Sequence, residues 1–486
     1  MKKNSLKKNM LYQMLYQIIT LITPLLTAPY ISRILGAENL GIYSYTLSIV
    51  NYFTMIAYLG VSNYGCKKIA EVYSLSVKKI QETFWSIYAV QLTSSLFSVI
   101  TYFVYFLCFV STYKTIYLIQ GIAIFSVLID VNWFFVGIEK FPIVATRNSI
   151  IKILTVVSIF VLVNSDKDLA LYALIMVLGT FLSNVITWFF ILKEIKFQHI
   201  KFKTALKKHI KGNIALFIPA IATLVYHTMD KTMLGLLSDY NNVGYYYSAD
   251  KVINIPLGII TSLGVVIMPR MSNLVSQHNS YEESSLLSKS LELTLFLSSI
   301  MSFGIAAVSK EFVPLFFGNE FEPCIFLIKL FAPILVIKSL SFFIQMQYMI
   351  PNNMERKYTI ATFCGAAINL LFNFILIPLC GAIGATIGTL GAEVTVLCIE
   401  IVLVRNKINI RYLFLGNIVY IFNAFISFIV ISLSSLYIQC NNLVKLFIEI
   451  VIGGIIYLLL CIPYWIRKKD SIFYFYLKKL NSFKEG

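Results

Sequence analysis

Residues 169–192 read LALYALIMVLGTFLSNVITWFFIL, a run of 24 residues that contains no charged side chain. A helix of this length crosses the hydrocarbon core of a bilayer, since each crossing needs about 20 apolar residues. A helix also satisfies the hydrogen-bonding groups of its own backbone, which lipid cannot do. The stretch therefore predicts a transmembrane helix.

Similar apolar stretches follow one another along nearly the whole chain, separated by short polar breaks. The composition agrees, with 58% hydrophobic residues, 13% charged residues and a mean hydropathy of +0.79. We expect an all-α integral membrane protein with about 14 transmembrane helices, which argues against an ordinary soluble enzyme. The predicted spans are 10–34, 40–64, 84–110, 115–138, 147–165, 169–192, 213–237, 243–269, 291–317, 323–350, 358–379, 380–404, 413–437 and 443–466.

Lysine and arginine gather in alternate polar breaks. The set of breaks that includes both ends of the chain holds 30 of them, and the other set holds only Arg33, Lys114, Lys167 and Lys251. Short loops rich in positive charge stay on the cytoplasmic side of a membrane. We therefore expect both termini in the cytoplasm and an even number of spans.

The net charge of +17 has the same origin. In a soluble protein it would suggest nucleic acid, whereas basic cytoplasmic loops fix topology and contact anionic lipid head groups. We expect membrane lipids, and not nucleic acid, as partners. The eight cysteines and four histidines are scattered, and the sequence shows no metal-ligand spacing, phosphate-binding loop or hydrolase motif. No metal, cofactor or catalytic residue is therefore expected.

The chain contains an internal repeat. The longest basic break, 193–212, follows the sixth predicted span, and the sequence after it echoes the start. Residues 33–36 match 231–235, residues 40–45 match 243–248, and residues 59–61 match 263–265, at a nearly constant offset. Three landmarks in the same order indicate duplication.

Both copies of the repeat start on the same side of the membrane, so they are parallel repeats. Transporters use such pairs to build two bundles that rock around a central cavity. We expect a six-helix bundle at 1–192, a basic amphipathic cytoplasmic linker at 193–212, a second six-helix bundle at 213–404, two additional transmembrane helices at 405–466 and a basic cytoplasmic tail at 467–486.

Glycines recur at three- or four-residue spacing late in the chain, at Gly381, Gly384, Gly388 and Gly391. Small residues at this spacing let the backbones of membrane helices approach closely. The pattern predicts close helix packing, with a hinge as the alternative.

Several short elements are spread over about 400 residues in a fixed order. They are PYISRILG at 29–36, LGIYSY at 40–45, DVNWFFVGIEKF at 130–141 with RN at 147–148, DKTMLG at 230–235, VGYYYSADK at 243–251, PRMS at 269–272 and IPLCGAIGAT at 377–386. With them the chain resembles polysaccharide-repeat-unit flippases of the Wzx type, in the superfamily that also holds multidrug-and-toxin exporters and the lipid II flippase. The run 133–141 is the most specific to the sugar-exporting branch.

The resemblance implies movement of polyprenyl-pyrophosphate-linked oligosaccharide units across the bacterial plasma membrane, by alternating access and without nucleotide. The units would serve a capsule, teichoic acid or O-antigen type of polymer, with a polysaccharide polymerase and glycosyltransferases as candidate partners. A drug or toxin exporter of the same fold stays open as an alternative. A membrane enzyme of polysaccharide assembly is a third reading, although the outer breaks are too short for a catalytic domain.

Charged side chains inside the spans are the candidate functional residues, because each costs roughly 2.5–3.5 kcal/mol to insert. Arg33 and Lys231 occupy matching places in the repeat, Lys251 starts the eighth span, and Lys338 lies near the middle of the tenth. Cationic side chains are suited to a pyrophosphate, so these four are candidate substrate-binding residues. For Arg33 and Lys251 the alternative is snorkelling to the interface, and for Lys338 it is an ion pair with Glu393.

Four further charges are candidates for ion coupling or for a structural role. For Asp130 and Lys152 we favour a structural ion pair, with a proton or cation site as the alternative. Asp230 stands beside Lys231 in one of the family-like elements, and Glu393 is the possible partner of Lys338. Lys338 also shares a helix face with Gln345, seven residues further on.

Overall fold

The computed structural model describes residues 3–198, 200–406, 415–468 and 473 of the 486-residue chain. In these residues every regular element is a helix, as the apolar pattern predicts. The chain divides into two compact units, Met1–Gly244 and Tyr245–Gly486. The boundary falls in the first turn of helix α9 (Tyr240–Ser276).

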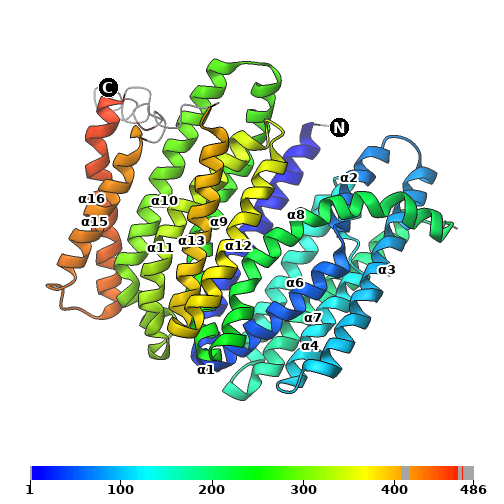
Figure 1. Ribbon diagram of the computed structural model, residues 1–486, viewed down its shortest axis with the longest axis horizontal. Helices are drawn as coiled ribbons and strands as arrows, with labels where there is room; N and C mark the ends of the chain where they lie inside the picture. The colour runs from blue at the N-terminus through cyan, green and yellow to red at the C-terminus, as the bar shows by residue number, and fades with distance from the viewer. Residues whose placement is uncertain (1–2, 199, 407–414, 469–472, 474–486) are drawn as a thin grey trace. The chain divides into compact units, whose positions relative to one another are not determined.

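The helices follow one another with short connections (Figure 1). The first unit contains α1 (Lys3–Tyr58), α2 (Val61–Val72), α3 (Val77–Phe109), α4 (Lys114–Leu128), α5 (Asn132–Gly137), α6 (Phe141–Leu162), η1 (Asp166–Asp168), α7 (Leu169–Glu194) and α8 (Phe202–Leu237). After α9, the second unit contains α10 (Ser280–Phe316), η2 (Asn319–Phe321), α11 (Pro323–Ile344), the π-helical turn η3 (Gln345–Met349), α12 (Glu355–Cys380), α13 (Ala382–Val404), α15 (Ile418–Ser434) and α16 (Asn442–Arg467).

The helices confirm a multi-pass membrane protein. Within the described ranges, ten helices are long and apolar enough to cross a membrane, and the bent α8 adds an eleventh if its two segments form one span. The shorter α4 and α15 are also apolar. Helix α1 covers the first predicted span and most of the second, with a kink between them at Gly36, where φ is 74° and glycine alone is unstrained. The count of 14 stays a prediction.

The predicted linker at 193–212 is partly helical, because α8 begins at Phe202 and continues into the next predicted span. Helix α8 packs against α1 and α3 of the first unit, and the Thr232 hydroxyl lies 2.7 Å from that of Ser48 on α1. The division into two bundles at this linker stays a prediction. The predicted tail at 467–486 lies outside the described residues except for 467, 468 and 473, as do residues 407–414 of the additional pair.

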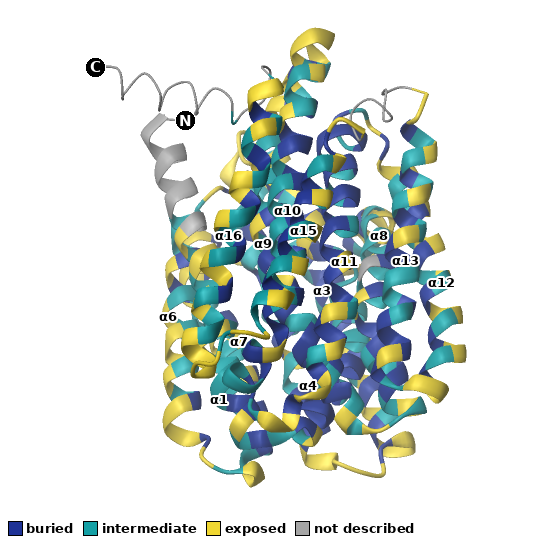
Figure 2. Ribbon diagram, turned by 90° about the vertical axis from the view of Figure 1, so that its left-hand side faces the viewer, coloured by how far each residue is buried: buried dark blue, intermediate teal, exposed yellow. Residues whose placement is uncertain are grey.

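Buried and exposed residues alternate along the helices, as the ribbon coloured by burial shows (Figure 2). Helix α3 is an example of how the lipid environment sorts side chains. Its exposed large side chains are apolar and recur at helical spacing, as at Phe97, Ile100, Phe103 and Leu107. Its opposite face buries serines that donate hydrogen bonds to backbone carbonyls of α1, as Ser98 does to Phe53 at 2.6 Å. A helix that is apolar outside and polar inside fits a hydrocarbon solvent.

The element 130–141 contributes to a buried cluster of the first unit. Trp133, Phe134 and Phe135 of the short α5 are buried in one cluster with Phe84 of α3. The Trp133 indole donates to Gln91 Oε1 at 2.9 Å, so its polar atom is satisfied inside the cluster. This element therefore packs against α2 and α3.

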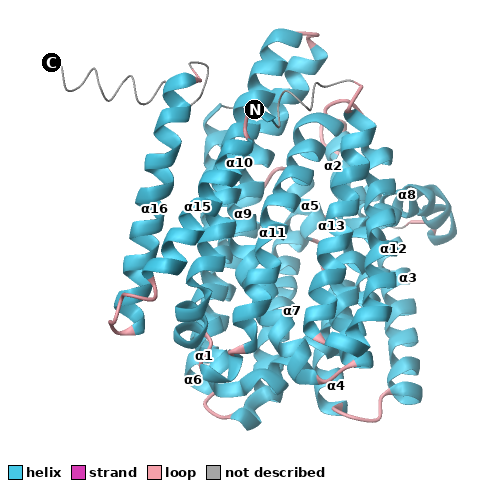
Figure 3. Ribbon diagram, turned by 60° about the vertical axis from the view of Figure 1, so that its left-hand side comes forward, coloured by secondary structure: helices cyan, strands magenta, loops and turns pink. Residues whose placement is uncertain are grey.

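Helices α12 and α13 form the close pair that the glycine spacing predicts, joined by a very short turn (Figure 3). A Cβ atom at Gly384 would lie 2.3 Å from the Leu376 carbonyl oxygen, and one at Gly388 would lie 2.3 Å from Asn373 Oδ1. Such distances leave no room for a methyl group. The prediction of close backbone approach is confirmed.

We expect Gly384→Ala to lower the free energy of unfolding by about 1–3 kcal/mol, because the added methyl group overpacks this contact. The melting temperature of the purified protein in detergent measures the effect. The control is Gly304→Ala on α10, whose Cβ would meet no heavy atom within 4 Å, and alanine there favours the helix. Equal melting of both variants and the parent protein would contradict the close contact.

Candidate functional site: charged side chains within the helices

Lys338 and Glu393 form an ion pair between α11 and α13 in the second unit. The ammonium nitrogen lies 3.0 Å from Glu393 Oε1. The Glu393 side chain is almost fully buried at 4% exposure, whereas that of Lys338 keeps 23%. The ion pair that the sequence offers as the alternative to substrate binding is thus present, and Lys338 still has one open side.

Glu400 lies two helical turns beyond Glu393 on α13 and is fully buried. The Ser341 hydroxyl donates to Glu400 Oε2 at 2.7 Å, and the Gln345 amide donates to Oε1 at 2.6 Å. Sequence reasoning did not select Glu400. The available signal was its spacing of seven from Glu393, which matches the spacing of seven from Lys338 to Gln345.

Gln345 begins the π-helical turn η3, where one extra residue widens the end of α11. Such turns occur rarely and are frequent at functional sites. The turn begins at the residue whose amide reaches Glu400. The C-terminal end of α11 is therefore shaped around this buried carboxyl group.

Asp130 and Lys152 in the first unit do not pair, so the prediction of a structural ion pair between them is wrong. Asp130 lies at the break between α4 and α5, where its carboxylate accepts from the Tyr58 hydroxyl at 2.6 Å and from the Asn132 backbone N–H at 2.9 Å. Lys152 on α6 instead places its ammonium 6.0 Å from the Tyr16 ring centre. The carboxylate is satisfied by a neighbouring helix and by its own turn.

Arg147 is a buried residue of α6, although the sequence places it at the end of a cytoplasmic loop. Its guanidinium donates to Asn132 Oδ1 at 2.7 Å, to Asn148 Oδ1 at 2.8 Å and to the Thr187 hydroxyl. Asn132 in turn donates to Asn184 Oδ1 at 3.1 Å. The network joins α5, α6 and α7 through one side chain.

Arg33, Asp230 and Lys231 also belong to the first unit. Arg33 is exposed on α1, three residues before the kink at Gly36. Asp230 is buried on α8, and the adjacent Lys231 is half-buried. Arg33 is thus an exposed cation near the kink of α1, and on α8 the buried Asp230 stands next to the cationic Lys231.

Lys251 lies on α9 in the second unit, one turn after Tyr247. Its ammonium lies 4.2 Å from the centre of the Tyr247 ring, within the range of a cation–π contact. The side chain is half-buried. The contact places the lysine charge against the face of an aromatic ring.

Two further ionic clusters attach α15 and α16 to α10, and sequence reasoning missed both. Buried Glu292 accepts from the Tyr420 hydroxyl at 2.7 Å and lies 3.5 Å from the Lys468 ammonium. Buried Glu311 lies 2.8 Å from the Lys445 ammonium. Each of these two buried carboxylates on α10 has a lysine from the last part of the chain, which fixes the additional helix pair.

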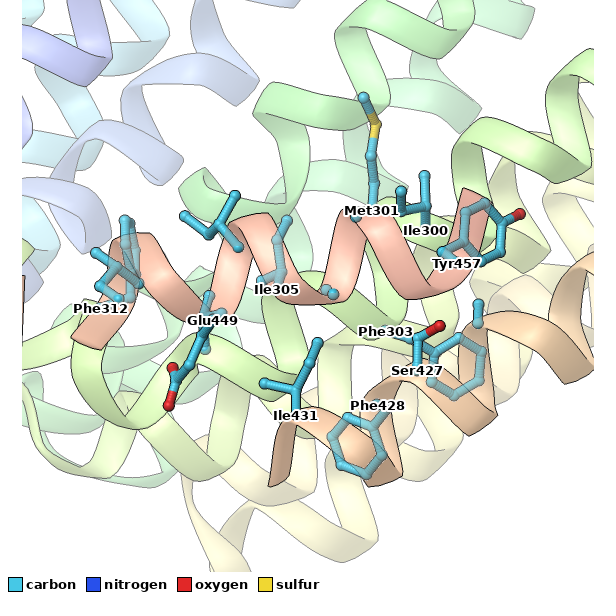
Figure 4. A pocket seen from close by; sticks show the side chains of 17 residues that line it. Ile300, Met301, Phe303, Ile305, Phe312, Ser427, Phe428, Ile431, Glu449 and Tyr457 are labelled. Carbon is cyan, nitrogen blue, oxygen red and sulfur yellow. The ribbon is translucent and has the colours of Figure 1, made fainter. Parts of the chain in front are cut away.

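A cavity of about 390 Å³ opens among α10, α15 and α16 (Figure 4). Its lining is apolar except for Ser427, the Tyr457 hydroxyl and Glu449, which is the charged residue in it. This lining suits an apolar chain and not a sugar. Over the described part of the chain, no three histidine, cysteine or acidic side chains gather in a way that could hold a metal ion.

The chain is similar in sequence to several known proteins. Residues 6–275 match the family model described as "Polysaccharide biosynthesis protein". An Escherichia coli (strain K12) protein described as a candidate O-antigen transporter is 25% identical over 417 residues, which cover 83% of this chain and 98% of that protein. A Haloferax volcanii protein described as a candidate flippase of low-salt glycan biosynthesis, Agl15, is 26% identical over 197 residues, 39% of this chain and 42% of that protein.

Among solved structures, the lipid II flippase MurJ in an inward closed conformation is similar with a TM-score of 0.75. The match covers 94% of this chain and 98% of that chain at 16% sequence identity. At this identity the similarity shows the fold alone. The all-helical fold is thus that of a known membrane transporter.

Proposed function

Since the chain belongs to the polysaccharide biosynthesis protein family, we propose that it is a flippase for polyprenyl-pyrophosphate-linked oligosaccharide repeat units. It moves them to the outer leaflet of a bacterial plasma membrane for assembly of a cell-surface polysaccharide. The observation that carries this proposal is the alignment with the relative described as a candidate O-antigen transporter, which runs over 98% of that protein. The protein transports and does not catalyse a reaction.

The cationic side chains Arg33, Lys231, Lys251 and Lys338 bind the pyrophosphate during this cycle. A pyrophosphate carries several negative charges, and cations with remaining exposure meet it without losing a full hydration shell. The 23% exposure of Lys338 and the exposure of Arg33 support this role. Lys338 exchanges its Glu393 partner for a phosphate oxygen, so its charge is never left alone in the membrane.

The basic breaks support cytoplasmic termini, and substrate enters from that side. The cycle alternates between inward and outward access without nucleotide. A polymerase and glycosyltransferases supply and consume the lipid-linked units as functional partners. The sequence offers no phosphate-binding loop, so an ion gradient or removal of the units outside drives export.

We expect liposomes that contain the protein to expose a labelled polyprenyl-pyrophosphate oligosaccharide to an impermeant quencher without added ATP. The quenched share should rise from that of the outer leaflet to nearly all of the label, since flipping equilibrates the leaflets. Protein-free liposomes are the control. Quenching that stays at the outer-leaflet share, or that requires ATP, would contradict the proposal, and uptake of a cationic dye instead would favour a drug exporter of the same fold.

A further inference from the structure

The polar side chains between α11 and α13 form two steps of a ladder. Lys338 meets Glu393, and seven residues further along both helices Gln345 meets Glu400. Because the partners advance in the same direction, α11 and α13 run parallel here. Seven residues span nearly two turns, so both steps occupy one helix face, about 10 Å apart.

The ladder contains two carboxylates and one cation. Lys338 pairs with Glu393, and none of the ion pairs in the described part of the chain includes Glu400. Helix α12 also packs on α13 and places its acidic, basic and tyrosine side chains in its first turn, at Glu355, Arg356, Lys357 and Tyr358. Helix α9 reaches α13 through the Tyr246 hydroxyl, which lies 2.9 Å from that of Thr389, eleven residues before Glu400. By contrast, buried Glu292 and Glu311 each have a lysine of their own.

The neutral donors around Glu400 satisfy it in either protonation state. The Gln345 amide donates to Oε1, and the Ser341 hydroxyl now donates to Oε2. A hydroxyl both donates and accepts, so Ser341 accepts the hydrogen bond when Glu400 carries a proton. A lysine or arginine in this place would have fixed the ionised form instead.

Loss of the lysine from the ladder would leave two ionised carboxylates in a low-dielectric interior, which is strongly unfavourable. In the proposed function, the pyrophosphate draws Lys338 away from Glu393 and thereby removes the cation from the ladder. A proton from water then restores the charge balance. Glu400 is the group that can take this proton, because its neutral partners stay hydrogen-bonded once the Ser341 hydroxyl has rotated.

We propose that Glu400 is a proton-binding residue that gains a proton when Lys338 leaves Glu393 for the diphosphate of the substrate. This inference rests on the proposed function and deepens it, since it names the group that couples substrate binding to protons. The same exchange in reverse releases the proton when the diphosphate departs.

Proton uptake on binding tests the proposal directly. Purified protein in weakly buffered detergent solution is mixed with farnesyl diphosphate, a short polyprenyl diphosphate, while a pH dye reports protons and quenching of intrinsic fluorescence reports binding. We expect the parent protein to take up a proton per bound ligand, and Glu400→Gln to bind without uptake. The matched control, Glu292→Gln, removes another buried carboxyl group and should keep the uptake.

Infrared spectra of the protonated carboxyl group test the proposal in a second experiment, the infrared arm, which needs no ligand. Between alkaline and acid buffer, Glu400→Gln should lack one carboxyl band that the parent protein and Glu292→Gln gain. Lys338→Ala should show that band already at neutral pH, because its acids have lost their cation. An unchanged band in Glu400→Gln, or equal proton uptake with and without Glu400, overturns the proposal. Absence of farnesyl diphosphate binding to the parent protein counts against the proposed function, while the infrared arm still decides for or against Glu400.

Discussion

Lys338→Ala is expected to reduce polysaccharide export to background. The substitution removes a cation that retains 23% exposure from the middle of a membrane helix, and with it one of the charges proposed to bind the pyrophosphate. It also leaves Glu393 buried without its partner, and breaking a buried ion pair in this way costs about 3–5 kcal/mol. Loss of the substrate-binding cation lowers surface polymer alone, whereas loss of the ion pair also lowers the amount of membrane-bound protein. Both quantities are therefore measured in the same cells.

A charge swap separates the two roles of Lys338. Lys338→Glu combined with Glu393→Lys rebuilds the ion pair, so we expect the amount of protein to recover toward normal. Export should stay at background, because the cation now stands on α13 and no longer where Lys338 presented it. If the swap restores export as well, the pair is structural only and Lys338 does not bind substrate.

Lys329→Ala provides the matched control on the same helix. Lys329 is exposed and lies nine residues before Lys338, on the opposite side of α11. We expect this variant to accumulate and to export normally. Normal export and normal amount of Lys338→Ala would show that Lys338 is neither a ligand nor an ion-pair partner.

The fold was predictable from the sequence because hydrocarbon imposes simple rules. An uncharged run such as 169–192 has one stable form in lipid, and the structure places α7 over almost the same residues. The glycine spacing likewise predicted close helix packing, since close backbone approach depends on residue size, and the structure shows α12 as the partner of α13. Resemblance, and not pattern, supplied the substrate class.

The partners of the buried charges were harder to predict, because they depend on how each helix is rotated. The Lys338–Glu393 pair could be proposed because both charges lie deep in apolar stretches. The predicted partner of Asp130 was wrong because the helix breaks around this residue, and the Tyr58 hydroxyl of another helix donates to its carboxylate. Sequence spacing relates positions on one helix, but it does not give the neighbour across the gap.

Glu400 and Arg147 were missed for related reasons. Glu400 lies near the C-terminal end of its span, where a charge is normally assigned to the interface. Arg147 follows a polar break, so it resembles a charge that fixes topology. The structure starts α6 at Phe141, which carries Arg147 more than one turn into the helix and turns it inward. A shift of a few residues in a helix start thus separates a loop charge from a buried one.

Arg147→Ala should prevent normal accumulation of the protein. It would remove the donor to Asn132 Oδ1 and one hydrogen bond each from Asn148 and Thr187 among packed helices. A buried polar group that is left unsatisfied costs about 1–3 kcal/mol. Arg147→Lys keeps the charge but has no planar fork, so it should recover only part of the stability. Membrane-bound protein and the melting temperature in detergent measure the series.

Lys140→Ala is the control, because Lys140 is a basic residue of the same region in an exposed ion pair with Glu194. Exposed pairs contribute about 0–1 kcal/mol, so this variant should accumulate and melt like the parent protein. Normal melting of Arg147→Ala would contradict the network. Normal melting of Arg147→Ala together with loss of export would move Arg147 from the scaffold to the transport path. The network instead predicts that export falls only in proportion to the folded protein that remains, because its partners are neutral side chains of α5, α6 and α7 and every guanidinium contact described serves to hold those helices together.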